Sequence, residues 1–432
     1  MRIEASERDA VKRAAFLCDS PDKIELVYGQ GRRETVAGIV ELYPQIITSE
    51  NFAEHAAVLP ELDAVFSTWG MPLLAAEQLV QMAKLKAVFY AAGSVKGFAA
   101  PLLQHGLVLC SGWGANAVPV AEFTLAQVLL SCKGYFRNTR DYVAPDTRRD
   151  NRVFRGPGVF GEVVGLVGLG MVGRTVAELL RAFELQVLAY DPYADKDAAT
   201  ELGVELVELS ELFARSLVVS NHLPNISATE GLLDGALFVT MRSDATVINT
   251  GRGAQVVEAE LIDVLRRRSD VTALLDVTLP EPPESESAFY TLPNVQLSSH
   301  IAGSMNDELV RMADHMIEEC ARWQRGEVDW KIGSCSLRLA QELRSADADE
   351  EALAHIERTT LLGEPRSLQA VAYFEMGEIL SDLSRCEEAM DAFLQVRIAD
   401  QTGTSPLAER AQWRYDELRF VGPSRDSFGA GC

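Results

Sequence analysis

Residues 163–174 read VVGLVGLGMVGR, and this stretch decides the fold. A short apolar run, typical of a buried strand, leads into Gly168, Gly170 and Gly173, which are spaced as GxGxxG, and an amphipathic helical pattern follows. The first glycine permits a tight turn, the second lets the backbone approach a pyrophosphate, and the third lets the helix pack on the strand. The helix amino terminus then presents unpaired N–H groups to the phosphates. The stretch therefore predicts a dinucleotide-binding turn, while a glycine-rich turn without a ligand is the alternative.

A carboxylate follows the next strand candidate. Residues 187–190 read VLAY and are followed by Asp191, which lies eighteen residues after Gly173. A carboxylate at this place can accept hydrogen bonds from the ribose hydroxyls and repels the extra phosphate of NADP. No Arg or Lys lies between residues 192 and 195 to neutralise that charge. We therefore expect the cofactor to be NAD.

Strands and helices alternate on both sides of this turn. Six strand candidates separated by helical segments predict a doubly wound parallel sheet. They lie at residues 163–168, 187–190, 217–222, 245–250, 271–277 and 295–300. Three earlier apolar runs predict a second, smaller open sheet. These runs lie at residues 62–68, 85–93 and 106–112.

Composition limits the class of protein. A chain of 432 residues should contain two or three domains. Its net charge of −23 argues against nucleic-acid binding, because phosphate contacts need a basic patch. The apolar stretches are too short to predict a membrane span, and the start of the chain does not resemble a signal peptide, so we expect a cytoplasmic protein that binds no membrane. Seven cysteines are scattered singly, from which we expect neither a disulfide nor a metal site.

Three charged or titratable residues follow strand candidates, at the edge where open α/β sheets bind ligands. Arg252 lies in NTGRG, Glu281 in DVTLPEP and His300 in SSHIAGS. Taken singly, an arginine between glycines is typical of a surface turn, a glutamate before proline is typical of a loop charge, and a histidine at a strand end is typical of a core residue. Their occurrence downstream of a nucleotide turn favours a catalytic group.

Taken in order, these motifs resemble those of the D-isomer-specific 2-hydroxyacid dehydrogenase family. The resemblance covers roughly residues 60 to 330 and includes a hinge helix at 114–130, GLVGLGMVGR, INTGRG, LDVTLPEP and HIAG. It implies that His300 donates or accepts the proton of the substrate hydroxyl, that Glu281 contacts the far ring nitrogen, and that Arg252 binds the substrate carboxylate and polarises the carbonyl. It also implies further cofactor contacts at Met171, Val172, His222, Leu223, Pro224, Thr250, Asp276 and Gly303. For Asp276, a structural role as a cap at the strand end is the alternative.

The substrate loop departs from the family pattern. In place of GVGxD the chain reads AAGSVKG, with Gly93 and Ser94 at the expected contact and Lys96 where the family has an acid. Backbone N–H groups can still bind a substrate carboxylate. Lys96 either selects a more acidic substrate or is simply solvated. The substrate itself stays open.

The sequence pattern and the resemblance together predict the architecture, and the resemblance implies the oligomer. We expect an α/β protein with two open parallel-sheet domains and an added all-helical C-terminal module. The expected domains are a flavodoxin-like substrate domain at residues 1–125 plus 304–333, a Rossmann NAD-binding domain at 126–303, and the helical module at 334–432. Family members usually dimerise through the cofactor domain, so a homodimer is expected.

The C-terminal module resembles a tetratricopeptide repeat. In residues 372–396, five residues fall at the small and large packing positions of that motif. These residues are Tyr373, Gly377, Leu380, Ala389 and Phe393. A module with fewer than three clear repeats is marginal alone, so we expect it to dock on the dehydrogenase body or on a protein partner. A degenerate helical extension without a binding role is the alternative.

The sequence therefore predicts an NAD-dependent dehydrogenase acting on a small 2-hydroxy or 2-keto acid. A catalytically idle NADH sensor that binds proteins through its helical tail is the competing hypothesis. A formate dehydrogenase-like enzyme is disfavoured, because that branch lacks the carboxylate partner that Glu281 supplies.

Overall fold

A computed structural model describes residues 12–150, 152–325, 366–383, 385–399 and 406–420. The chain divides into two compact units, Met1–Asn116 with Met305–Cys432, and Ala117–Ser304. The division falls within α5 (Trp113–Cys132). By length and composition this helix is apolar enough to cross a membrane, a test that core helices of water-soluble proteins also pass, and 44% of its apolar stretch is buried.

The first unit contains a five-stranded sheet in the order β2-β1-β3-β4-β5, in which every pair is parallel. The strands are β1 (Arg13–Phe16), β2 (Glu41–Leu42), β3 (Ala64–Ser67), β4 (Ala87–Tyr90) and β5 (Val108–Ser111). This order is that of flavodoxin-like sheets. The three strands expected from the sequence are present, and β1 and β2 add two that were not expected.

Alternate residues of these strands pack on opposite faces, so the unit has three layers. Phe16, Phe66 and Phe89 pack with Met312 and Met316 of α13 (Val310–Gln324), which covers one face. The opposite face packs against other residues of the unit, including Leu79, Leu102 and Leu103. The remaining helices are α1 (Pro21–Tyr28), α2 (Arg32–Ile39), α3 (Ala76–Gln81) and α4 (Ala99–Gln104), with 3-10 turns η2 (Phe52–His55), η3 (Leu59–Glu61) and η7 (Asn306–Glu308).

The second unit contains a seven-stranded parallel sheet in the order β12-β11-β10-β9-β6-β7-β8. The strands are β6 (Val163–Val167), β7 (Gln186–Tyr190), β8 (Val204–Leu206), β9 (Val218–Asn221), β10 (Thr246–Asn249), β11 (Thr272–Leu275) and β12 (Val295–Leu297). Six of them were expected, and β8 was not. Strands β6 to β8 follow one another toward one side of the sheet, and strands β9 to β12 toward the other side. Such sheets bind ligands at the point between β6 and β9 where this order changes.

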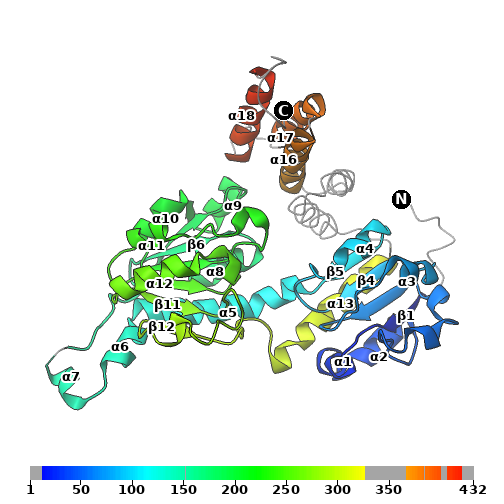
Figure 1. Cartoon of the computed structure of the whole chain (residues 1–432), viewed down its shortest axis with the longest axis horizontal. Coiled ribbons are helices and arrows are strands. Elements are labelled where there is room, and N and C mark those ends of the chain that lie inside the picture. Colours follow the sequence, from blue (N-terminus) through cyan, green and yellow to red (C-terminus); the bar gives the residue numbers. More distant parts are fainter. Residues whose placement is uncertain (1–11, 151, 326–365, 384, 400–405, 421–432) are drawn as a thin grey trace. The chain divides into compact units, whose positions relative to one another are not determined.

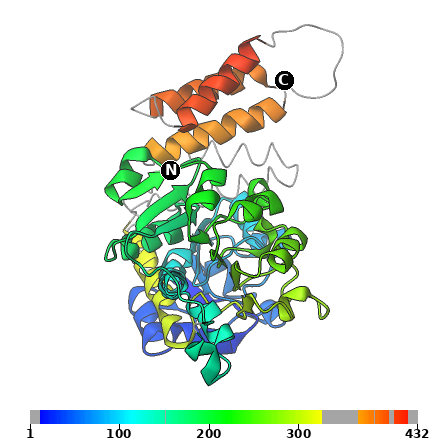
Figure 2. The ribbon, with the colours of Figure 1, turned by 90° about the vertical axis from the view of Figure 1, so that its left-hand side faces the viewer.

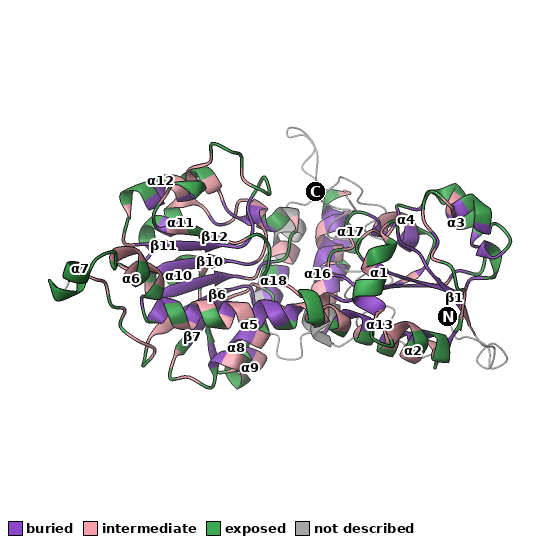
Figure 3. Ribbon diagram, turned by 90° about the horizontal axis from the view of Figure 1, so that it is seen from below, coloured by how far each residue is buried: buried purple, intermediate pink, exposed green. Residues whose placement is uncertain are grey.

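Helices cover both faces of this sheet. On one face, Val176, Ala177 and Leu180 of α8 (Met171–Leu180) pack against β6 and β7, together with Ala121 and Val128 of α5. The other face packs against α10 (Leu209–Arg215), α11 (Gly235–Thr240) and α12 (Glu258–Arg267). Figure 3 shows the inner strands β9, β10 and β11 buried along their length, while the surrounding helices carry both buried and exposed residues. The unit is completed by α9 (Lys196–Glu201) and by 3-10 turns η4 (Ser227–Thr229), η5 (Gly253–Gln255) and η6 (Ala288–Tyr290).

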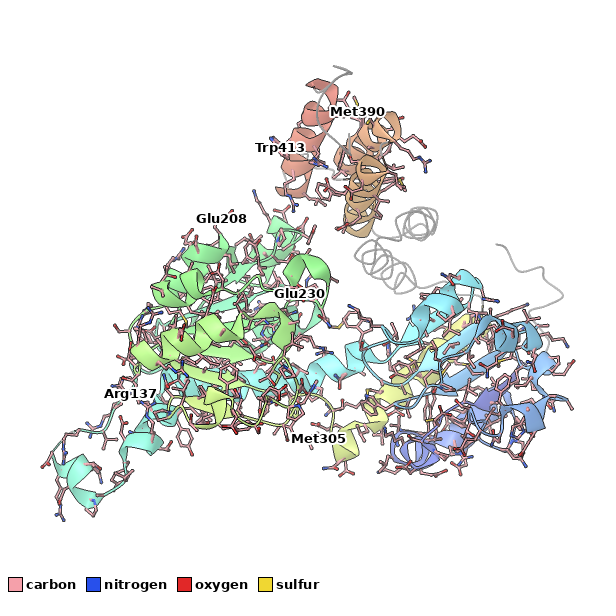
Figure 4. All side chains as sticks on the ribbon, viewed as in Figure 1. Arg137, Glu208, Glu230, Met305, Met390 and Trp413 are labelled. Atoms are coloured by element: carbon pink, nitrogen blue, oxygen red, sulfur yellow. The ribbon has the colours of Figure 1, made fainter. Side chains whose placement is uncertain are left out.

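An arm extends from the second unit. It carries α6 (Tyr135–Asp141) and α7 (Pro145–Arg149), and Figure 1 shows α7 beyond the rest of that unit. Arg137, labelled in Figure 4, holds the base of the arm by pairing with Asp244 in the body of the unit. Tyr135, Tyr142 and Val143 are exposed on it.

Three helices form the described part of the C-terminal module: α16 (Arg366–Asp382), α17 (Cys386–Ala399) and α18 (Pro406–Phe420). Figures 1 and 2 show them side by side. A Cβ on Gly377 would lie 2.6 Å from the ring of Phe393, so glycine at 377 lets α16 and α17 pack closely. Against expectation, Cys386 is disulfide-bonded, and its partner lies outside the described residues. Single scattered cysteines gave no spacing from which this pairing could be predicted.

Candidate active site

The predicted nucleotide turn joins β6 to α8. Gly168 has a φ of +95°, which favours glycine, and a Cβ there would lie 2.9 Å from the His222 carbonyl carbon. A Cβ on Gly173 would lie 2.1 Å from the Gly168 carbonyl oxygen, so only glycine lets the helix approach the strand this closely. A Cβ on Gly170 would meet nothing within 4 Å, which leaves space before the helix amino terminus. Each glycine therefore has the surroundings that a dinucleotide turn requires.

Asp191 follows β7 and faces this turn. Its carboxylate accepts hydrogen bonds from the Leu169 N–H at 2.8 Å and from the Tyr193 N–H at 2.9 Å. These two bonds fix the carboxylate beside the glycine turn, where a ribose would lie if a dinucleotide were bound.

Two polar atoms at this edge of the sheet are buried and have no hydrogen-bond partner among the described residues. They are Nε2 of His222, which follows β9, and Oγ1 of Thr250, which follows β10. Burial lowers the pKa of His222 to about 4, so its imidazole is neutral at pH 7. Because unsatisfied buried polar atoms are rare, these two atoms fit a site that a polar ligand completes. Leu223 and Pro224 continue the same segment, and their carbonyl oxygens accept from Gln255 at 2.7 and 2.8 Å.

Arg252 lies in the turn after β10, between two glycines. Its Nη1 donates to the Gly251 carbonyl at 2.7 Å, and its side chain is partly exposed. A Cβ on Gly253 would lie 2.0 Å from the carbonyl carbon of Thr278 and 2.4 Å from the Leu279 nitrogen. Glycine at 253 therefore lets the backbone beside Arg252 lie directly against the segment that leads to Glu281.

Glu281 and His300 form a hydrogen-bonded pair. Nδ1 of His300 lies 2.6 Å from Oε1 of Glu281, and the side chains are 47% and 40% exposed. His300 has a φ of +58°, an uncommon conformation for a residue with a side chain. With Nδ1 engaged by the carboxylate, Nε2 is the ring atom left to meet a substrate.

Asp276 fixes the turn that contains His300. It follows β11 and is 2% exposed. Its carboxylate accepts from the Ser298 hydroxyl at 2.6 Å and from the Ile301 and Ala302 N–H groups at 2.9 Å each, and its carbonyl accepts from the His300 N–H at 3.0 Å. These bonds are those of the structural cap that the sequence left open as an alternative, and Gly303 directly follows the turn.

Sequence reasoning missed three supporting residues. Asn221 and Gln255 are fully buried and bond to each other and to the segments on either side of Arg252. Glu258 accepts from the Leu279 N–H at 2.7 Å, next to the Glu281 segment, and burial raises its pKa. The signal for Asn221 was a polar amide at the end of an otherwise apolar strand, LVVSN.

The predicted substrate loop belongs to the first unit. Gly93 follows β4, and its carbonyl oxygen accepts from the Ser111 hydroxyl at 2.7 Å. Ser94 and Lys96 are exposed.

Residues 125–302 match the sequence model of the D-isomer specific 2-hydroxyacid dehydrogenase family, NAD binding domain. These residues are therefore similar to the NAD-binding domain of that family. The match confirms the predicted resemblance, and NAD is the cofactor named for that domain. The glycine turn, Asp191, and the unpartnered His222 and Thr250 atoms are residues that fit such a cofactor.

Two curated relatives are D-3-phosphoglycerate dehydrogenases. That of Archaeoglobus fulgidus is 31% identical over 223 residues, which are 52% of this chain and 42% of the relative. That of Mycobacterium tuberculosis is 30% identical over 272 residues, which are 63% of this chain and 51% of the relative. The chain therefore spans about half the length of these dehydrogenases.

Solved structures show the same fold. D-mandelate dehydrogenase of Rhodotorula graminis superposes with a TM-score of 0.60 at 21% identity, covering 72% of this chain and 94% of that protein. A D-lactate dehydrogenase of Treponema pallidum superposes with a TM-score of 0.55 at 21% identity, covering 73% and 98%. The predicted fold class, two open parallel sheets with additional C-terminal helices, is confirmed.

Proposed function

We propose that the chain is an NAD-dependent oxidoreductase that transfers a hydride between nicotinamide and a small 2-hydroxy or 2-keto acid. The observation that carries this proposal is the 2.6 Å contact between His300 Nδ1 and Glu281 Oε1, at the same edge of the same sheet as the glycine turn. That pair supplies a proton carrier where the dehydrogenase family needs one.

In the direction of reduction, the protonated imidazole of His300 gives a proton from Nε2 to the carbonyl oxygen of the substrate as that oxygen gains negative charge. Bound nicotinamide supplies the hydride. Glu281 accepts the Nδ1–H throughout, so it holds the plane of the imidazole ring. In the direction of oxidation, the neutral imidazole accepts the hydroxyl proton.

Arg252 binds the carboxylate of the substrate. A planar guanidinium can engage two oxygens at once, and the bond from Nη1 to the Gly251 carbonyl restricts its orientation. Local positive charge is needed because the chain as a whole carries −23. Gly93 and Ser94 would contribute backbone N–H groups from the substrate domain, which we assign to residues 1–125 plus 304–333.

The cofactor contacts are proposed from the same edge of the sheet. NAD binding is assigned to residues 126–303, with these groups: Gly168, Gly170, Met171, Val172, Gly173, Asp191, His222, Leu223, Pro224, Thr250, Asp276 and Gly303. Asp191 favours NAD over NADP, because its fixed carboxylate repels the extra phosphate on the NADP ribose.

NADH absorbance tests the proposal directly. The full chain is mixed with NADH and, in turn, glyoxylate, hydroxypyruvate, pyruvate and phosphohydroxypyruvate, and the series is repeated with NADPH. We expect oxidation of NADH by at least one of the four acids and slower turnover with NADPH. Tight binding of NADH without turnover of any acid would instead support the NADH-sensing alternative.

A homodimer is proposed on separate grounds. The arm exposes Tyr135, Tyr142 and Val143, and residues 133–155 contain seven Lys or Arg against three Asp, in a chain that is acidic overall. Such an arm suits an acidic surface on a second copy. Light scattering of the full chain should give twice the mass of the monomer, and substituting Tyr142 and Val143 with Ser and Asp should lower it.

The helical module is proposed to dock on a protein surface. Trp413, labelled in Figure 4, is 63% exposed on α18 and is available for such a contact. Limited proteolysis distinguishes the alternatives, because release of a tail without folded structure would contradict a docked module.

A further inference from the structure

A network of three buried amides lies beneath the candidate active site. Asn221 ends β9, Asn249 ends β10, and Gln255 ends η5. Nδ2 of Asn221 donates to Oδ1 of Asn249 at 3.0 Å and to Oε1 of Gln255 at 2.5 Å. All three side chains are at most 1% exposed.

The network reaches the backbone on both sides of the Arg252 side chain. Oε1 of Gln255 accepts from the Arg252 N–H at 3.0 Å, and Nδ2 of Asn249 donates to the Arg252 carbonyl at 3.1 Å. Oδ1 of Asn249 also accepts from the Gly251 N–H at 3.1 Å. The residue that presents the guanidinium is therefore bonded at both its N–H and its C=O.

The same amides hold the segment that follows His222. Nε2 of Gln255 donates to the carbonyls of Leu223 and Pro224 at 2.7 and 2.8 Å, and Oδ1 of Asn221 accepts from the Leu223 N–H at 3.2 Å. Both hydrogens and both acceptor positions of the Gln255 amide are thus used. A fully satisfied polar network in a dry interior rigidifies its surroundings, whereas a partly satisfied one is costly.

Glycine at 251 supports the importance of this arrangement. A Cβ there would lie 2.7 Å from Oε1 of Gln255 and 3.0 Å from Nδ2 of Asn221. Any side chain at 251 would therefore displace the amides, so the glycine and the network depend on each other.

We propose that Asn221 and Gln255 are positioning residues. They fix the turn that carries Arg252 relative to the Leu223–Pro224 segment, which is proposed to bind the cofactor. This inference rests on the proposed function. One buried amide, Gln255, bonds both to Arg252 and to the Leu223–Pro224 segment, so a single substitution should disturb the binding of keto acid and of NADH together.

The test compares Gln255→Leu and Gln255→Glu with Asn294→Leu. Asn294 is a matched control, since it is a buried amide whose Nδ2 donates to the carbonyls of Leu265, Arg268 and Val271. It directly precedes β12, so it lies at the opposite edge of the same sheet from the site. The measurements are KM and kcat for a 2-keto acid, the Kd for NADH by fluorescence, and the melting temperature.

We expect Gln255→Leu to raise both KM for the keto acid and Kd for NADH by about tenfold, because buried bonding groups lose their partners and the two segments shift. Gln255→Glu keeps the acceptor for Arg252 but sets a carboxylate against two carbonyls, so it should raise Kd for NADH more than KM. Asn294→Leu should lower the melting temperature and leave KM and Kd within twofold of wild type. Values of KM and Kd within twofold of wild type in Gln255→Leu, at a lowered melting temperature, overturn the inference.

If Gln255→Leu does not fold, Gly251→Ala replaces it, because a single methyl group presses on the same amides, and a rise of about threefold or more in KM and Kd is then expected. If the wild type binds NADH but reduces no 2-keto acid, the proposed function fails while the network is still judged by NADH affinity. A tenfold loss of NADH affinity in Gln255→Leu then supports the positioning role, and a change below twofold overturns it.

Discussion

Replacing Gly253 with alanine should push the turn that carries Arg252 away from the segment that leads to Glu281. A Cβ at this position would lie 2.0 Å from the carbonyl carbon of Thr278, 2.2 Å from its oxygen and 2.4 Å from the Leu279 nitrogen. All three are backbone atoms, so no side chain can rotate away to make room. Ordinary contact begins at 3.4 Å, and the two segments must therefore part by about 1.4 Å.

The size of the effect follows from that displacement. One segment carries Arg252 and the other leads to Glu281, the partner of His300. A misplacement of about 1 Å among groups that act on one substrate lowers the rate by about a hundredfold. We therefore expect Gly253→Ala to lower kcat/KM for a 2-keto acid by about a hundredfold, and overpacking to destabilise the unit by about 1–3 kcal/mol.

Steady-state kinetics with NADH measures the loss, and NADH fluorescence measures cofactor affinity separately. Affinity for NADH should fall less than kcat/KM, because the glycine turn and Asp191 lie after other strands. Gly38→Ala is the control, since a Cβ at Gly38 meets nothing within 4 Å, and it should leave kcat/KM unchanged. If Gly253→Ala folds and keeps kcat/KM within twofold of wild type, the close approach does not position the site, and the reasoning is refuted.

Three other substitutions test single groups. Asp191→Ser should raise the ratio of kcat/KM with NADPH to that with NADH by about tenfold, since a carboxylate no longer repels the extra phosphate of NADPH. An unchanged ratio in a coenzyme titration would contradict this role. His300→Asn should lower kcat by about a hundredfold or more while NADH still binds. Asparagine tolerates the positive φ, but its amide does not gain or lose a proton near neutral pH. A kcat within tenfold of wild type would show that His300 does not transfer the proton. His222 keeps a pKa of about 4 in the fold against an ordinary 6.5, so the unfolded chain takes up its proton first as the pH falls. Stability should therefore fall by on the order of 3 kcal/mol between pH 6.5 and pH 4, and His222→Leu should remove that part of the acid sensitivity in denaturant titrations; an equal loss in the variant would place its origin elsewhere.

The sequence predicts the parts of the fold that depend on long apolar patterns. Six strands of the second unit were expected, because each is a short apolar run between helical segments. β8 was not predicted, because its three residues, VEL, contain an exposed glutamate and do not form an apolar run. β2 consists of two residues, and its place beside β1 is set by pairing with a distant segment, which no local pattern can show.

At the site, the sequence locates residues that follow strand ends. The contact between His300 and Glu281 follows this rule, since both lie in segments after adjacent parallel strands. The role of Asp276 could not be decided from sequence, because a carboxylate at a strand end can face a ligand or hold a loop. Its three hydrogen bonds to residues 298–302 hold the loop, and the proposed cofactor contact would be made in addition to them.

Exposure separates the groups that sequence reasoning finds from those it misses. His300 and Glu281 are nearly half exposed, whereas Asn221 and Gln255 are fully buried and bond to each other and to backbone groups. A reacting group must meet a substrate, so its residue type is constrained by chemistry and can be recognised in a motif. A supporting group is constrained only by the backbone atoms around it, which come from distant parts of the chain. The glycines at 251 and 253 are constrained in the same way, because atoms from other segments lie too close to their Cα atoms for a side chain to fit. The placement of the arginine therefore depends on groups whose identity only the folded chain explains.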